Sequence, residues 1–158
     1  MNGCTDPLLE LLPHRPPMTM LSGIVSVDGQ GRAVAVADVS EDSIFHDSAL
    51  GGVPGCAAIE YMAQTVALIV GDRHRRNGET PKVGFLLGTR KLDVSIPSFK
   101  SGTRDEVKAN CIYSDDEFAS FDCTITDPDG TTVASATLTA FQPPGDPEEF
   151  AEKMKERG

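Results

Sequence analysis

The chain has 158 residues, in which 14 Lys and Arg stand against 24 Asp and Glu, so its formal net charge is −10. This length suits one domain with a substantial hydrophobic core. A hydrophobic share of 39% with 24% charged residues is typical of a globular protein rather than a disordered one. An acidic protein of this kind lacks the basic surface that a nucleic acid or an anionic membrane requires, so we expect neither as a partner.

The apolar runs and the cysteines narrow the class further. Glu60 interrupts the longest apolar run, which leaves no stretch of the roughly 18 residues that a membrane-spanning helix needs. The cysteines are scattered, without a Cys-x-x-Cys pair or histidines at metal-ligand spacing, as expected for reduced thiols; they are Cys4, Cys56, Cys111 and Cys123. The N-terminus lacks the basic stretch of a secretory signal. We therefore expect a cytoplasmic protein that holds no metal.

The first third of the chain predicts a short helix, two strands and a loop. The helix covers Asp6–Leu12 and is ended by the prolines that follow it. The strands cover Ser22–Asp28 and Gly31–Val39, on either side of a glycine turn. Alternate positions of the second strand are alanines, so one of its faces can pack closely against another element. A loop rich in Asp, Ser and Gly then covers Ser40–Pro54.

A buried helix is predicted over Gly55–Val70, because its residues are apolar on nearly every face. The Pro-Gly pair before it fits a helix start, and Gly71 fits a stop. The turn Asp127–Gly130 predicts that the strands on either side of it pair as a hairpin. The strands predicted after the helix are Lys82–Ser95, Asp105–Ser114, Phe118–Thr126 and Thr131–Phe141.

From Gln142 onward the composition changes. A proline-rich breaker cluster precedes the charged segment Glu148–Gly158. We therefore expect one domain over residues 1–142 and a charged tail over residues 143–158, built from a linker and either a surface helix or a disordered segment.

One buried helix combined with long antiparallel strands is an α+β pattern. A flat sheet would leave one side of that helix in water, so the sheet must wrap around it. We therefore expect the hotdog fold, in which a curved antiparallel sheet surrounds one long central helix.

Glu60 is the only charged residue between Asp47 and Asp72. An unpaired carboxylate on a buried helix is costly, so either one stripe of the helix is solvated or Glu60 lines a cavity. Gln64 lies one turn later on the same face and can hydrogen-bond the carboxyl group and orient it. This pair favours a cavity in which Glu60 acts as a general acid.

The three histidines are His14, His46 and His74. His46 lies in a loop rich in Ser and Asp, where a histidine is more often an ordinary surface residue than a catalytic one, and the local pattern does not separate the two. We expect His74, in an arginine-rich segment, to be an ordinary polar residue. His14 follows the first helix, and we expect it to be a buried structural histidine.

The segment Val53–Cys56 opens the buried helix. Free backbone N–H groups at Gly55 and Cys56 could stabilise an oxyanion at this helix N-terminus. A Pro-Gly pair also begins many helices that have no such role.

Taken together, the spacing His46-x8-Gly55-x4-Glu60-x3-Gln64 resembles the active-site segment of the 3-hydroxyacyl-[acyl-carrier-protein] dehydratases of the FabA/FabZ type, which have the hotdog fold. In that family a histidine precedes a Pro-Gly at the head of the central helix, followed by an acidic residue and a Met-Ala-Gln-like segment. One departure is clear. The family's His-Phe-Pro-Gly-x-Pro-x-Met-Pro-Gly loop is rewritten here, although its length is kept.

Two further segments are similar to the same family. Leu11–Arg15 with Pro17 is similar to its Leu-Pro-His-Arg-x-Pro entry segment. Gly84–Arg90 most resembles the subgroup found in aryl-polyene biosynthesis clusters. The similarity spans about residues 8–142.

The resemblance implies a reaction and roles for the site residues. It implies dehydration of a 3-hydroxyacyl thioester on acyl carrier protein to the trans-2-enoyl thioester, in fatty-acid or aryl-polyene biosynthesis, without a cofactor. His46 is then the base, Glu60 the acid and Gln64 its orienting partner, with Gly55 and Cys56 at the thioester oxygen. In the relatives the histidine and the acid come from different subunits, which implies a homodimer, a higher oligomer, or a heterodimer with a related dehydratase.

Two other functions fit the same features. A hotdog thioesterase shares the fold and the helix carboxylate, but it usually lacks a histidine at the position of His46. A weakly active or non-catalytic subunit of a heterodimeric dehydratase would explain the rewritten loop. We favour the enzyme, since both candidate catalytic residues are present.

An acidic carrier protein would need a local basic surface on this acidic chain. The segment Gly71–Lys108 holds nine basic and five acidic residues. It is either a docking face or a set of ordinary solvated loops. The docking residues that we expect within it are Arg73, Arg75, Arg76, Arg90 and Lys91.

Overall fold

This structure is a computed structural model that describes residues 10–79, 85–142 and 147–157. Its elements in chain order are β1 (Gly23–Val27), β2 (Arg32–Asp38), β3 (Gly52–Pro54), a 3-10 turn (Gly55–Ala57), α2 (Ala58–Arg76), β4 (Phe85–Val94), β5 (Ser98–Lys100), β6 (Arg104–Ser114), β7 (Phe118–Thr126), β8 (Thr132–Phe141) and α3 (Pro147–Glu156). None of the helices in these ranges is long and apolar enough to cross a membrane.

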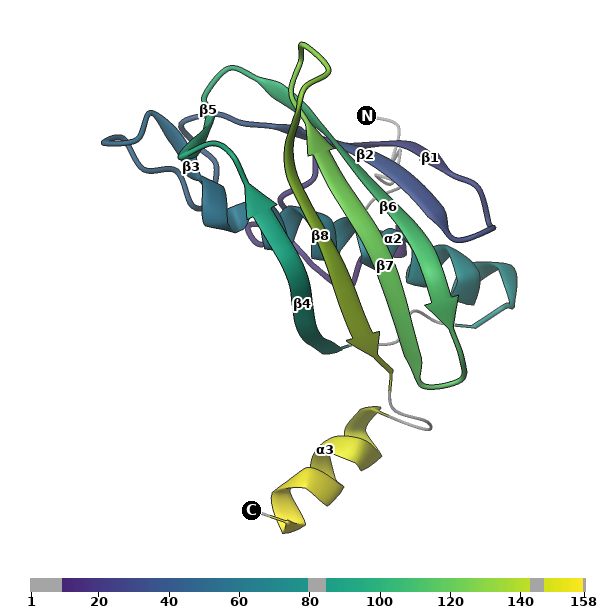
Figure 1. Cartoon of the computed structure of the whole chain (residues 1–158). Helices are drawn as coiled ribbons and strands as arrows, with labels where there is room; N and C mark the ends of the chain where they lie inside the picture. Colours follow the sequence, from purple (N-terminus) through teal and green to yellow (C-terminus); the bar gives the residue numbers. More distant parts are fainter. Residues whose placement is uncertain (1–9, 80–84, 143–146, 158) are drawn as a thin grey trace, which may run out of the picture.

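Six strands form one antiparallel sheet in the order β1-β2-β6-β7-β8-β4, and β3 pairs separately with β5. The sheet curves across α2, which runs along its concave side (Figure 1). The predicted α+β hotdog fold is confirmed. The predicted hairpin is confirmed as well, because β7 pairs with β8 and Gly130 N donates to Asp127 O at 3.0 Å across the turn.

The core lies between α2 and the concave face of the sheet. In β2 the alanines Ala33, Ala35 and Ala37 are buried and alternate with more exposed residues, as period-2 alternation requires. Small side chains on this strand leave room for the larger side chains of α2, such as Met62 and Leu68, which are fully buried. Alternation in β2 therefore sets how closely the helix approaches the sheet.

The end of the central helix differs from our prediction. Gly71 does not end it: α2 continues to Arg76. A Cβ atom on Gly71 would collide with the backbone carbonyl of Leu11, which crosses the helix at this point. The glycine is needed because the N-terminal segment lies directly on α2, and not because the helix stops there.

Several segments were missed or fall outside the described ranges. The short strands β3 and β5 lie in segments that we expected to be a loop or a connection. The predicted helix Asp6–Leu12 lies mostly outside the described residues, as does the start of the predicted strand Lys82–Ser95. The segment 143–158 contains the helix α3, which Figure 1 draws apart from the sheet.

Asp105 on β6 is a carboxylate in the core, only 4% exposed. Its Oδ2 accepts a hydrogen bond of 3.2 Å from Thr103 Oγ1. Burial raises its pKa above the ordinary 3.8, and the negative charge of Asp127 raises it further. Because the folded pKa lies above the unfolded one, the stability that this group contributes is lost as the pH rises from about 4 through the folded pKa.

We expect Asp105→Asn to remove this loss, because the amide keeps an acceptor for Thr103 and carries no charge. The variant should match the wild type in thermal unfolding near pH 4 and should unfold at a higher temperature at pH 7. Circular dichroism melts at several pH values test this. Asp116→Asn, at an exposed position, is the control and should leave the pH dependence unchanged. A temperature difference that does not grow with pH would contradict the prediction.

Candidate active site

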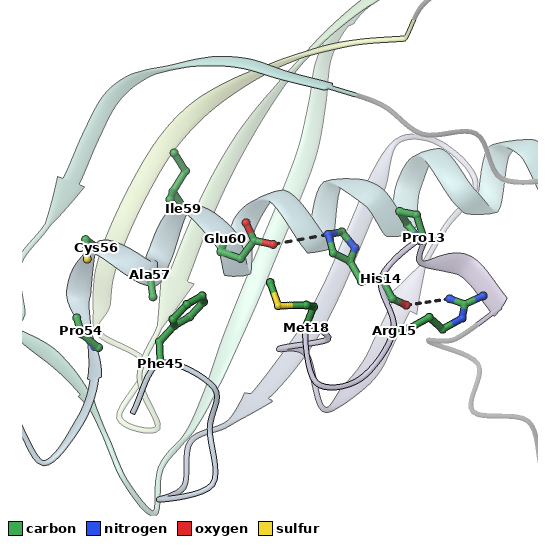
Figure 2. Close-up of a pocket in the computed structure, with 10 residues that line it drawn as sticks. All are labelled: Pro13, His14, Arg15, Met18, Phe45, Pro54, Cys56, Ala57, Ile59 and Glu60. Atoms are coloured by element: carbon green, nitrogen blue, oxygen red, sulfur yellow. Dashed lines mark hydrogen bonds and ion pairs between the residues drawn. The ribbon is translucent and has the colours of Figure 1, made fainter. Parts of the chain in front are cut away.

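A cavity of about 710 Å³ opens beside the first turns of α2 (Figure 2). Its walls come from residues 13–18 near the N-terminus, the loop before β3, the end of β3, the 3-10 turn and the start of α2. Most of the lining side chains are apolar, and Glu60 is the one carboxylate among them. The lining residues are Pro13, His14, Arg15, Met18, Phe45, Pro54, Cys56, Ala57, Ile59 and Glu60.

Glu60 lies in the first turn of α2 and points into this cavity. Its side chain is 35% exposed, so the carboxyl group reaches the cavity and is not sealed within the helix packing. Oε1 accepts a hydrogen bond of 2.9 Å from Gln64 Nε2. The same oxygen lies 3.6 Å from His14 Nε2.

Gln64 is fully buried, and each polar atom of its amide is used. Oε1 accepts from Met20 N at 2.8 Å, while Nε2 donates to Met18 O at 2.9 Å and to Glu60 Oε1. Met20 N can only donate and Met18 O can only accept, so these two groups decide the orientation of the amide. The amide N–H is therefore directed at the carboxyl group of Glu60.

His14 lies in the cavity, and its side chain is 29% exposed. We expected a buried structural histidine, and this expectation was wrong. The ring contacts Glu60, which is 46 positions away in the chain and belongs to another element (Figure 2). Local spacing carries no signal for such a contact, and the Leu-Pro-His-Arg segment was the one sequence feature that pointed to His14.

His46 is half-buried and is not among the residues that line the cavity. Its Nε2 lies 2.9 Å from Ser101 Oγ. The preceding residue, Phe45, does line the cavity. Within one chain, therefore, the structure brings Glu60 together with His14 and Gln64, whereas His46 is not among the described lining residues.

Gly55 has a different role from the expected one, which was to donate its N–H to an oxyanion. Its N–H donates to Pro97 O at 2.9 Å and is not free for an oxyanion. A Cβ atom at this position would lie 2.5 Å from Ile96 O, so glycine is needed here for the close approach of residues 96 and 97. Cys56 is exposed and lines the cavity, which leaves its N–H as the candidate donor at the helix start.

The five expected docking residues fall into two groups. Arg75 and Arg76 both form ion pairs with the buried Asp72, at 2.9 and 2.7 Å, so this one carboxylate balances one of their two positive charges. Arg73 Nη1 donates to Ser114 Oγ at 3.2 Å. The two residues of the other group are exposed on β4, which forms the edge of the sheet opposite to β1; they are Arg90 and Lys91.

Within residues 10–79, 85–142 and 147–157, no group of three or more His, Cys, Asp or Glu side chains could hold a metal ion. The side chains with polar or ionisable groups that line the cavity are Glu60, His14, Arg15 and Cys56.

Comparison with known proteins identifies the family. A family model described as ApeP dehydratase, of the ApeP-like family, matches residues 6–152. The chain belongs to the ApeP-like dehydratase family. The solved dehydratase heterocomplex ApeI:P from Xenorhabdus doucetiae is similar to this family member with a TM-score of 0.85 and 29% identity, covering 94% of this chain and 97% of that chain.

Curated relatives of this ApeP-like chain are named 3-hydroxyacyl-[acyl-carrier-protein] dehydratase FabZ. The protein from Methylobacterium radiotolerans is 35% identical over 93 residues, which is 57% of this chain and 59% of the relative. The protein from Anaeromyxobacter dehalogenans is 32% identical over 82 residues, or 50% and 53%. The chain thus spans about half the length of the curated relatives that it matches. The PaaI protein of E. coli, at TM-score 0.59 and 17% identity over 75% of this chain and 81% of that one, shares the fold.

We expect Gln64→Leu to lower the free energy of unfolding by about 0.5–1.5 kcal/mol for each part-buried hydrogen bond that it removes, namely those to Met18 O and Met20 N. Chemical denaturation of the purified variant measures this loss. Gln30→Leu, at an exposed turn position, is the matched control and should stay within about 0.5 kcal/mol of the wild type. Equal stability of Gln64→Leu and the wild type would contradict the hydrogen-bond network described above.

Proposed function

We propose that this protein removes water from a 3-hydroxyacyl thioester carried by acyl carrier protein and yields the trans-2-enoyl thioester, in fatty-acid or aryl-polyene biosynthesis in the cytoplasm. The observation that carries the proposal is Glu60, the single carboxyl group among the described residues that line a largely apolar cavity in a dehydratase-family chain. The relatives named FabZ dehydratases support the same reaction. The free thiols of Cys56, Cys111 and Cys123 suit a reducing compartment.

The proposed reaction needs a base, an acid and a donor for the thioester oxygen. A base takes the proton from C2, and the electron pair left behind forms the C2–C3 double bond as the C3–O bond breaks. Glu60 gives its proton to the departing hydroxyl group, which leaves as water. The Cys56 N–H at the start of the helix stabilises the negative charge that develops on the thioester oxygen. Return of the C2 proton from the base to Glu60 restores both groups.

The cavity suits an acyl chain. Its walls include Met18, Phe45 and Ile59, whose side chains can exclude water from an apolar chain. Excluding water also strengthens the hydrogen bonds made to the reacting groups. A volume of about 710 Å³ lies within the range of sites that hold small molecules.

The base in this proposal is His46 of the partner subunit in a dimer. Within one chain His46 lies outside the cavity that holds Glu60, next to Phe45 in its wall. Strand β4 ends the six-stranded sheet, with Leu86 and Leu92 exposed at 45% and 40%. An edge that is partly apolar and unpaired among the described strands is a natural surface for pairing with a second subunit. Similarity to the ApeI:P heterocomplex supports a second subunit that is either a copy of this chain or a related dehydratase.

The carrier protein in this proposal docks on the basic residues that keep their charge free. Arg90 and Lys91 on β4 meet this condition better than Arg75 and Arg76, which are paired with Asp72. Arg73 is an intermediate case: its side chain is engaged by Ser114, but this partner is neutral and leaves the charge of Arg73 unbalanced. An acidic carrier protein would be attracted to such sites even though the whole chain is negative.

We expect Glu60→Gln to lower the rate of water loss by about 10²–10⁴-fold, because the amide keeps the shape of the acid but has no acidic proton to transfer to the hydroxyl group. His46→Gln should cause a loss in the same range. Mass spectrometry of 3-hydroxyacyl carrier proteins of several chain lengths, incubated with each purified variant, measures the enoyl product. Circular dichroism checks that both variants are folded, and wild-type-like turnover by either one would contradict its assigned role.

Sharing of the site between subunits predicts complementation. In a mixed dimer of His46→Gln and Glu60→Gln chains, one of the two sites recovers both wild-type residues and the other loses both. Random mixing of the two inactive chains should therefore restore about a quarter of the wild-type rate in a homodimer with two-fold symmetry. Co-expression with separable tags allows the mixed dimer to be purified, and this dimer by itself should show about half of the wild-type rate, because one of its two sites is intact. No recovered activity in the mixed dimer would show that each site is built within one chain.

A second candidate is a subunit that supports catalysis by a related dehydratase. The similarity to a heterocomplex favours it, since that structure contains two different dehydratase subunits by its name. The same mass-spectrometric assay separates the cases. Under this alternative the pure protein gives no enoyl product, and product appears when a related dehydratase is added. Release of free thiol in place of an enoyl thioester would instead identify a thioesterase.

A further inference from the structure

The imidazole of His14 is held in a defined place against Glu60. Arg15 Nη1 donates to the carbonyl oxygens of Leu12 and His14, at 2.7 and 2.8 Å, and so fixes the backbone on both sides of Pro13. The ring then projects into the cavity with Nε2 facing Glu60 Oε1 at 3.6 Å (Figure 2). Among the described residues that line the cavity, the charged side chains are Glu60 and Arg15.

Two groups converge on the same oxygen of Glu60. Gln64 Nε2 donates to Oε1 at 2.9 Å, and His14 Nε2 approaches it at 3.6 Å. Among the described residues, Oε2 has no hydrogen-bond or ion-pair partner. A carboxylic acid carries its hydrogen on one oxygen, and an oxygen that already receives an N–H is the unfavourable place for it. The acid hydrogen of Glu60 therefore belongs on Oε2, the oxygen without a partner among the described residues.

The other ring nitrogen of His14 shows which form of the imidazole fits. Nδ1 is buried and has no hydrogen-bond partner in the described part of the chain. A buried N–H without an acceptor is costly, so a hydrogen on Nδ1 is disfavoured in both the neutral and the protonated ring. The remaining form is the neutral ring with its hydrogen on Nε2, which points at Glu60.

We propose that His14 is a positioning residue for the acid: its Nε2–H, together with the amide of Gln64, engages Oε1 of Glu60 and keeps the acid proton on Oε2, directed at the departing hydroxyl group. This inference rests on the proposed dehydration and adds a residue to it. The separation of 3.6 Å is longer than a hydrogen bond. Such contacts shorten when substrate closes the site, so the Nε2–H becomes a full donor in the substrate complex.

The variants His14→Gln and His14→Leu separate donation from packing. Glutamine can place an N–H near the position of Nε2, whereas leucine fills similar space without a donor. We expect His14→Leu to lower kcat for water loss by about 10- to 100-fold with KM within about twofold. His14→Gln should recover most of this loss. His74→Gln is the control, because His74 is buried near the other end of α2 beside Gln142 and outside the cavity; its kcat should match the wild type.

A second substrate isolates the acid step. Chloride leaves a 3-chloroacyl thioester without needing a proton, while the base still removes the proton from C2. His14→Leu should therefore eliminate chloride at a rate within about twofold of the wild type, although it loses water slowly. Equal losses for the two substrates would mean that leucine damages the site as a whole, and would overturn the positioning role. A wild-type kcat for water loss in His14→Leu would overturn it as well.

The tautomer gives a readout that does not need turnover. Nitrogen-15 NMR of the wild-type protein at about pH 8.5, where imidazoles are neutral, should show the His14 hydrogen on Nε2, with His14→Gln used to assign the signals. A hydrogen on Nδ1 in an active wild type would overturn this inference and leave the dehydratase proposal standing. If neither this chain alone nor its mixture with a related subunit dehydrates any substrate, the proposed function fails, and the catalytic part of this inference fails with it.

Discussion

The buried amide of Gln64 is the interaction on which the site depends. The amide oxygen accepts from Met20 N and the amide nitrogen donates to Met18 O, so a flip of the amide would lose both backbone hydrogen bonds. Its remaining N–H is thereby committed to Glu60 Oε1. One side chain thus ties the N-terminal segment to α2 and fixes the direction of a cavity carboxyl group. The three hydrogen bonds of Gln64 therefore hold the N-terminal segment on α2 and also orient the proposed acid.

Close backbone packing supplies the frame for this amide. Leu11 crosses α2 at Gly71, where a Cβ atom would collide with its carbonyl, and the alanines of β2 let the helix sit low on the sheet. At the other end of the helix, Gly55 donates to Pro97 O and admits residues 96 and 97 to the same close distance. The helix is therefore held at both ends, and the first turn with Glu60 has little freedom relative to the cavity walls.

Periodicity in the sequence predicted the parts of this fold that are long enough to show it. The strands β2, β6, β7 and β8 are seven or more residues long and alternate over most of their length, and their predicted bounds agree with the structure to within one residue. The three-residue strands β3 and β5 are too short to alternate. The helix end predicted at Gly71 was wrong, because a glycine that allows another segment to cross a helix cannot be distinguished in sequence from one that ends it. The contact of His14 with Glu60 joins distant segments, and composition carries no trace of it.

The proposed reaction gives a physical reason why His46 and Glu60 of one chain are kept apart. An imidazole base and a carboxylic acid placed in contact would exchange their proton and lose the two states that dehydration needs together. In the proposed arrangement His14 avoids this conflict as a neutral donor, since its Nδ1 has no acceptor among the described residues to support a positive ring. A base brought in by a second subunit approaches from the substrate side instead, so that the acyl chain lies between base and acid. On this view, pairing of subunits assembles the site, and the free edge at β4 belongs to the catalytic design as much as Glu60 does.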